Sequence, residues 1–175
     1  MKKIFFAFLA INFILSACND SAETGSNPSS EKSNKKENAT QVLNNISVET
    51  EGDVEVYRAF LSYEDGSTVP SSNKTSLGKP IYLNLNITKG WTEENGQVSL
   101  GASEKISTDN GTVILEAPDL FSNVNSLASD DAKFVRLKAV ISNMSGPIEY
   151  FVVDYKVWDK KGNGVIKGSY KFYIE

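Results

Sequence analysis

The sequence predicts an all-β domain over residues 47–175, an antiparallel sandwich of two sheets with about seven strands. Apolar and polar residues alternate along the predicted strands, as they do when one face of a sheet is buried and the other is wet. Turn signals rich in Gly, Asn and Asp separate the strands, and no segment has the period of an amphipathic helix. Many short strands without helices favour two packed sheets.

The individual strands are placed by this alternation and by the turns between them. Residues 109–111, Asp-Asn-Gly, predict a tight turn that joins two strands into a hairpin. Residues 118–133 lack a strand pattern, and Asp119 is expected to cap a single helical turn there. The clearest strand has one apolar face, made of Ile81, Leu83, Leu85 and Ile87. The expected strands cover residues 54–63, 80–88, 98–106, 112–117, 134–142 and two segments within 150–173.

The last two strands form a hairpin whose register the sequence predicts. If Trp158 lies opposite Val165, then Tyr155 lies opposite Gly168, where the glycine leaves room for the ring. The apolar pairs from Phe151 to Val157 then share the core face. A slip of one residue would expose them to water, so a single register is expected.

The residues of this last hairpin also resemble those of a known family of domains. The strand from Tyr150 runs into the turn Asp159-Lys160-Lys161-Gly162-Asn163, and together they resemble the closing hairpin of bacterial immunoglobulin-like domains. The resemblance covers about 25 residues and consists mostly of turn chemistry. It implies an immunoglobulin-like sandwich and indicates little about function.

The beginning of the chain predicts export and a lipid anchor. Two lysines precede an apolar run over residues 4–15, which is shorter than the roughly 20 residues that span a bilayer. This layout is typical of a secretory signal, here residues 1–17. Leu15-Ser16-Ala17-Cys18 resembles the lipobox of bacterial lipoproteins, which implies cleavage before Cys18 and acylation of its thiol and new amine. Two or three acyl chains suffice for stable membrane anchoring.

A polar segment follows the expected anchor. Residues 18–46 are rich in Ser, Asn, Lys and Glu, and therefore predict a disordered tether with a reach of roughly 30 Å. Within it, Asp20-Ser21-Ala22 resembles the O-glycosylation sequon of the Bacteroidota, which implies a sugar on Ser21. With the loop over residues 90–96, the chain resembles small uncharacterised lipoproteins of that group. This implies an outer-membrane location, on either the periplasmic side or the cell surface.

Composition narrows the possible chemistry. Removal of two lysines with the signal leaves 16 of the 18 Lys and Arg residues against 22 Asp and Glu, a net charge of −6. An acidic surface argues against binding nucleic acid. The chain has no histidine, and Cys18 is its only cysteine, so catalytic triads and the usual metal sites are unavailable. We therefore expect no cofactor and no enzyme; a glycoside hydrolase with two carboxylates is the remaining familiar mechanism.

Four aromatic residues are candidate ligand-binding residues. Trp91 lies in a polar loop directly after a predicted strand, where it would either contact a ligand or fold back over the end of the sandwich. Tyr150, Trp158 and Tyr173 fall on the outer face of the last hairpin. They would either form a docking strip or pair across the strands to cover the sheet.

Acidic turns raise a weaker possibility, a calcium site. Asp109, Asp159 and Asn163 are the candidates, with Asn110, Asp130 and Asp131 as further oxygen ligands in loops. None has the spacing of a calcium loop. The preference of Asp and Asn for turns explains each position equally well.

These observations favour a lipid-anchored envelope lipoprotein whose sandwich is a non-enzymatic binding module for an envelope protein or a glycan. The alternative is a structural subunit of an envelope assembly that associates with itself through exposed edge strands. A carboxylate-dependent hydrolase is the third hypothesis.

Overall fold

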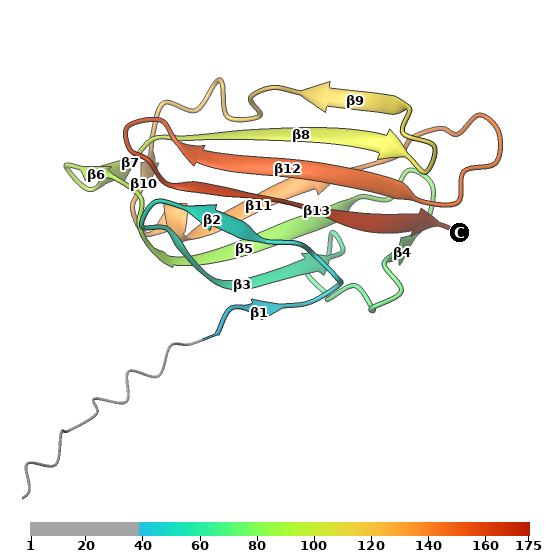
Figure 1. Ribbon diagram of the computed structural model, residues 1–175, viewed down its shortest axis with the longest axis horizontal. Helices are drawn as coiled ribbons and strands as arrows, with labels where there is room; N and C mark the ends of the chain where they lie inside the picture. Colours follow the sequence, from blue (N-terminus) through green and yellow to red (C-terminus); the bar gives the residue numbers. More distant parts are fainter. Residues whose placement is uncertain (1–38) are drawn as a thin grey trace, which may run out of the picture. The chain divides into compact units, whose positions relative to one another are not determined.

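The computed structural model describes residues 39–175 (Figure 1). The predicted signal peptide, Cys18 and Ser21 lie outside the described residues. Within residues 39–175, no helix is long and apolar enough to cross a membrane.

Two large sheets form the domain, and they are seen as two layers in Figure 1. The first has the order β1 (Gln41–Val42), β3 (Glu55–Ser62), β5 (Ile81–Lys89) and β11 (Phe134–Ala139). The second has the order β2 (Glu49–Glu51), β13 (Val165–Ile174), β12 (Phe151–Asp159), β8 (Leu100–Thr108) and β9 (Val113–Ala117). In the second sheet, β4 (Lys74–Thr75) also pairs with β13.

The predicted sandwich is confirmed. The described residues contain seven strands of five or more residues, namely β3, β5, β8, β9, β11, β12 and β13. The first, second and fifth of these share one sheet, and the remaining four share the other. This division differs from the constant-type immunoglobulin arrangement in one strand, because the fourth strand, β9, lies in the second sheet.

The core lies between the two sheets and follows the expected alternation. In β5 every second residue from Ile81 to Ile87 is buried. The predicted register of the last hairpin is confirmed, with Trp158 opposite Val165 and Phe151 opposite Phe172. The Phe151 and Phe172 rings stack in the core with centroids 5.4 Å apart. The hairpin of β8 and β9 is also confirmed.

The segment 118–133 differs from its prediction. It contains the short strand β10 (Leu127–Ala128), which pairs with β7 (Gln97–Val98), and β7 pairs with β6 (Glu93–Glu94). A single 3-10 turn, η1, covers Asp131–Lys133. The expected strand over residues 98–106 is therefore divided between β7 and β8, because its first residues pair with this small third sheet.

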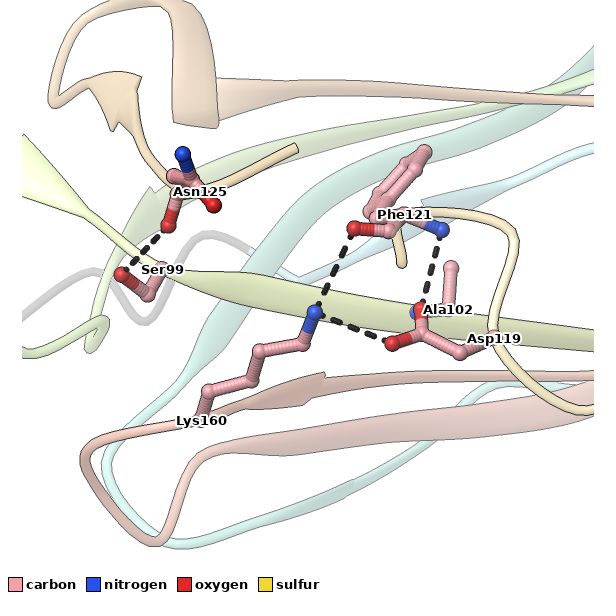
Figure 2. A network of polar contacts seen from close by, with 6 residues as sticks. All are labelled: Ser99, Ala102, Asp119, Phe121, Asn125 and Lys160. Atoms are coloured by element: carbon pink, nitrogen blue, oxygen red, sulfur yellow. Dashed lines mark hydrogen bonds and ion pairs between the residues drawn. The ribbon is translucent and has the colours of Figure 1, made fainter. Parts of the chain in front are cut away.

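Asp119 caps a short turn as expected, but residues 120–123 form a turn and not a helix. Asp119 Oδ1 accepts from the backbone N–H groups of Phe121 at 2.9 Å and Ala102 at 3.2 Å. Lys160 Nζ lies 2.9 Å from Asp119 Oδ2 and donates to the Phe121 carbonyl at 3.3 Å (Figure 2). Ser99 Oγ donates to the Asn125 carbonyl at 2.9 Å. Bonds to β8 and the β12–β13 loop thus fix the connection, and it needs no helix.

The start of the domain is also earlier than expected. The tether was predicted to extend to residue 46, but β1 pairs with β3 in parallel, and Asn44 and Ile46 are buried. Asn44 Nδ2 donates to the Val69 carbonyl at 2.9 Å, and its Oδ1 accepts from the Leu61 N–H at 2.9 Å. Asn44, whose residue type and neighbours are typical of a disordered tether, therefore links separate segments of the sandwich.

Candidate functional site

Trp91 folds back over the end of the sandwich. Its side chain is half-buried against the core, and its Nε1 donates to the Ala132 carbonyl at 3.0 Å. A Cβ added at Gly164 would lie 3.1 Å from the indole ring, so Trp91 packs closely on the β12–β13 loop. This arrangement fits the structural alternative for Trp91, because its one polar group is already bonded within the domain.

The structure does not bring the other three aromatic candidates into one strip. Trp158 lies over Gly101 at one end of β12, where an added Cβ would be 2.1 Å from the indole. Tyr150 is eight positions away, which corresponds to roughly 26 Å along a strand. There it contacts Tyr173 edge to face, with ring centroids 6.2 Å apart. Cross-strand packing of Tyr150 and Tyr173 is therefore observed.

Tyr173 also lines a polar groove of about 470 Å³. Lys171 Nζ lies over the Tyr150 ring, 3.9 Å from its centroid, at the same end of the hairpin. The neighbouring loop is held by Asn73, whose Nδ2 donates to the carbonyls of Asn44 and Lys171, both at 2.8 Å. These bonds hold the loop that forms one side of the groove.

The calcium candidates are not gathered at one place. Asp109 precedes β9, near the Phe151 end of β12, whereas Asp159 is the last residue of β12. Both carboxylates accept backbone bonds: Asp109 Oδ2 from Glu149 at 2.9 Å, and Asp159 Oδ2 from Thr92 at 2.6 Å. Residues 39–175 contain no group of three or more acidic or cysteine side chains placed to hold a metal.

A different surface has the features of a binding site. It is the solvent-facing side of the β3–β5–β11 part of the first sheet, which we call the arginine–aromatic face. Its residues alternate with core residues such as Leu61, Leu83 and Leu137 and therefore point away from the core. Cross-strand pairing arranges them in three rows: Arg58, Asn86 and Phe134; Phe60, Asn84 and Arg136; Ser62, Tyr82 and Lys138.

The two guanidinium groups of this face lie over aromatic rings. Arg136 Cζ lies 3.7 Å from the centroid of the Tyr82 ring, and Arg58 Cζ lies 4.3 Å from that of Phe60. Arg136 Nη2 also donates to the Tyr63 carbonyl at 3.0 Å. Stacking on a ring fixes the plane of a guanidinium and leaves its edge free to donate. Both arginines of the chain are thus ordered on one face.

One ring of the face remains open. Phe134 is 69% exposed, the most exposed large apolar residue of the described chain. The Asn84 amide nitrogen donates to Ser62 Oγ at 2.9 Å and to the Tyr82 carbonyl at 3.0 Å, which orders the middle of the face. An exposed aromatic platform beside ordered polar groups is typical of recognition surfaces.

The charge of this face is opposite to that of the whole chain. Its nine positions carry three cations, Arg58, Arg136 and Lys138, and no carboxylate, whereas the chain has a net charge of −4. The nearby Glu55 forms an ion pair with Lys89 at 2.9 Å. The face therefore produces a local positive potential on an acidic protein.

The size of the face limits what it can bind. Three strands and three rows cover roughly 14 by 20 Å, or roughly 300 Å² of sheet surface. A stable protein–protein interface buries about 800 Å² on each partner. A flat surface of this extent suits a narrow, chain-like ligand.

This face is not evident in the sequence because its residues come from three separate strands. The polar side of residues 80–88, where Tyr82 and Asn84 lie, is expected only to face water. The available signal was that both arginines occupy polar positions of predicted strands, each two residues from an aromatic residue. Only the pairing of β3 with β5 and of β5 with β11 shows that they share a face.

One buried carboxyl was also not foreseen. Glu104 alternates with Ala102 and Ile106 in β8, faces the core, and is 3% exposed. Burial raises its pKa to about 7, and its Oε1 has no hydrogen-bond partner among the described residues. Burial in the apolar core is the cause of this rise.

The fold and this surface define a β-sandwich domain with an ordered cationic and aromatic face. No protein-family model and no curated protein matches the chain. Among solved structures, the chain is similar to the crystal structure of the C-terminal domain of wzt, at 10% identity and a TM-score of 0.48. The alignment covers 75% of this chain and 78% of that chain.

Proposed function

We propose that the protein is a lipid-anchored, non-enzymatic binding module, and that the arginine–aromatic face binds an extended glycan of the bacterial envelope. The observation that carries this proposal is the composition of nine neighbouring positions: three cations, three aromatic rings and two amides, without a carboxylate and with one buried serine, Ser62. Aromatic rings, amides and arginines supply the stacking and hydrogen bonding that a polyhydroxylated chain needs.

The shape of the face favours a glycan over a protein or peptide. Its area is well below that of a standard protein interface. Peptides are usually bound at a free sheet edge or in a groove. The arginine–aromatic face instead lies on the flat side of a sheet, with β5 paired on both edges. A glycan chain can lie across such a surface without either feature.

The anchor belongs to the same proposal. Leu15-Ser16-Ala17-Cys18 resembles a lipobox, and the polar segment after it would hold the domain away from the membrane surface. Cys18→Ala in the cell should release the protein from the outer-membrane fraction and abolish labelling by palmitate. Retention of Cys18→Ala in that fraction would contradict the anchor, while leaving the binding proposal open to its own test.

The binding proposal is tested by affinity electrophoresis of residues 19–175 through gels that contain envelope polysaccharide. Phe134→Ala should reduce retardation at least tenfold, because Phe134 is the exposed platform of the face. Leu77→Ala is the matched control, since Leu77 is 47% exposed outside the face. Equal retardation of both variants would contradict a role for this face.

One observation favours the structural-subunit alternative. The edge strand β9 exposes three successive apolar residues, Val113 at 50%, Ile114 at 47% and Leu115 at 42%, and no strand within residues 39–175 pairs with its outer side (Figure 1). Exposed apolar edges associate readily. Under the binding proposal, sedimentation at increasing concentration should show a monomer. A concentration-dependent oligomer that Ile114→Lys abolishes would favour the assembly role.

A further inference from the structure

We infer that the glycan is acidic, and that Arg58 and Arg136 bind its carboxylate or phosphate groups. This inference rests on the proposed glycan-binding function and specifies the chemistry of the ligand. Three independent properties of the arginine–aromatic face support it: the geometry of the guanidinium groups, the absence of competing carboxylates and the spacing of the two arginines.

The first property is the orientation of the guanidinium groups. A guanidinium binds a carboxylate or phosphate through two parallel N–H bonds, and this requires its plane to be fixed. The Phe60 and Tyr82 rings restrain the guanidinium groups of Arg58 and Arg136, with Cζ to centroid distances of 4.3 and 3.7 Å. The bond from Arg136 Nη2 to the Tyr63 carbonyl adds a second restraint. A neutral sugar can accept single hydrogen bonds from these groups, whereas an acidic group also uses their charge and their paired N–H geometry.

The second property is that the cations of the face are not neutralised. Within residues 39–175, none of Arg58, Arg136 and Lys138 forms an ion pair with a carboxylate. The outer side of the second sheet carries charges of both signs. Lys105 pairs with Asp154 at 2.9 Å and Lys167 with Glu51 at 2.7 Å, while Lys156 and Lys171 lie over the Trp158 and Tyr150 rings. An anionic polymer is therefore attracted to the arginine–aromatic face more strongly than to the opposite side of the domain.

The third property is spacing. Arg58 lies on β3 in the first row, and Arg136 lies on β11 in the second row. Two strand spacings and one row separate their Cα atoms by roughly 12 Å. A single small anion does not bridge that distance, whereas a polymer with repeated acidic groups does. Phe134, in the same row as Arg58, would contact the sugar rings between the acidic groups.

The test uses two pairs of polysaccharides with matched backbones. Polygalacturonate is compared with its methyl ester, and phosphomannan with mannan, so that carboxylate and phosphate recognition are measured separately. Residues 19–175 are titrated at low and physiological salt by biolayer interferometry. At least one acidic member should bind tenfold or more tightly than its neutral partner.

Substitutions locate the effect on the face. Arg58→Gln and Arg136→Gln should each weaken binding of the acidic polysaccharide at least tenfold. Arg136→Lys should weaken it severalfold, because lysine keeps the charge and loses the planar fork. Lys156→Gln is the matched control, since it removes one exposed charge from the second sheet and should change binding less than twofold. Circular dichroism of each variant should match the wild type.

Each other outcome overturns the inference in a recognisable way. If the acidic and neutral polysaccharides bound equally well, and Phe134→Ala abolished both, the ligand would not need to be acidic. The proposed glycan-binding function would then still hold. If Lys156→Gln weakened binding of the acidic polysaccharide as much as Arg136→Gln does, the binding would be non-specific charge attraction. If the face bound poly-glutamate and none of the four polysaccharides, both proposals would fail in favour of an acidic peptide partner.

Discussion

Replacing Glu104 with glutamine is expected to stabilise the folded domain at pH 8 and to leave its stability unchanged at pH 4. Burial raises the pKa of this carboxyl from 4.5 to about 7. At 1.36 kcal/mol per pKa unit, the difference corresponds to about 3 kcal/mol of unfolding free energy. Glutamine has the same shape without the charge, so its variant should be more stable by about that amount at pH 8.

The direction follows from the protons bound by each state. Between pH 4.5 and about 7, folded Glu104 holds a proton that the unfolded chain has released. Wild-type stability should therefore decrease as pH rises through this window, and the loss should be complete above it. Below pH 4.5 both states are protonated, and the two proteins should unfold alike.

Urea denaturation of residues 37–175, followed by tryptophan fluorescence from pH 4 to pH 8, measures this difference. Lowered pKa values at other sites, such as Asp65 and Asp130, affect both proteins equally and cancel in the comparison. A gap between the two proteins that does not change with pH would refute the reasoning. It would mean that Glu104 reaches water or a partner when it ionises.

Three further changes test the packing. Trp91→Ala should lower the unfolding free energy by about 2 kcal/mol in urea, because a half-buried indole and its bond to Ala132 are lost; unchanged stability would contradict its role as a plug. Asn73→Ala should cost about 3 kcal/mol, since it leaves the carbonyls of Asn44 and Lys171 without their donor; a loss below 1 kcal/mol would show that water replaces the amide. Gly101→Ala should displace the Trp158 ring, which lies 2.1 Å from the added Cβ, and shift its fluorescence; an unchanged spectrum would contradict that contact.

The sandwich was predictable because its strands carry their own pattern. Residues 81–87 alternate strictly, and the hairpin of β12 and β13 has only one register that buries its apolar pairs. Local chemistry of this kind can be read from one segment at a time. Strand limits were less accurate, because the ends of β7 and β11 depend on partners that come from elsewhere in the chain.

The candidate site was not predictable for the same physical reason. A binding face on a sheet is formed across strands, and Arg58 and Arg136 are 78 positions apart in the sequence. Trp91 and Trp158 were candidate ligand-binding residues, but both pack within the domain, and this packing accounts for their presence. Asn44 was assigned to the tether because composition does not distinguish a solvated asparagine from a buried one.

The parallel pair of β1 and β3 has a mechanical consequence. If the protein is tethered through Cys18, as proposed, a pull from the membrane enters the domain at β1, which pairs with β3 over two residues. That short pair would detach under tension before the sheets separate, because the next anchor, Asn44, is bonded to Leu61 and Val69 inside the domain. Under tension β1 would therefore detach and lengthen the tether, while the surface formed by β3, β5 and β11 keeps its structure.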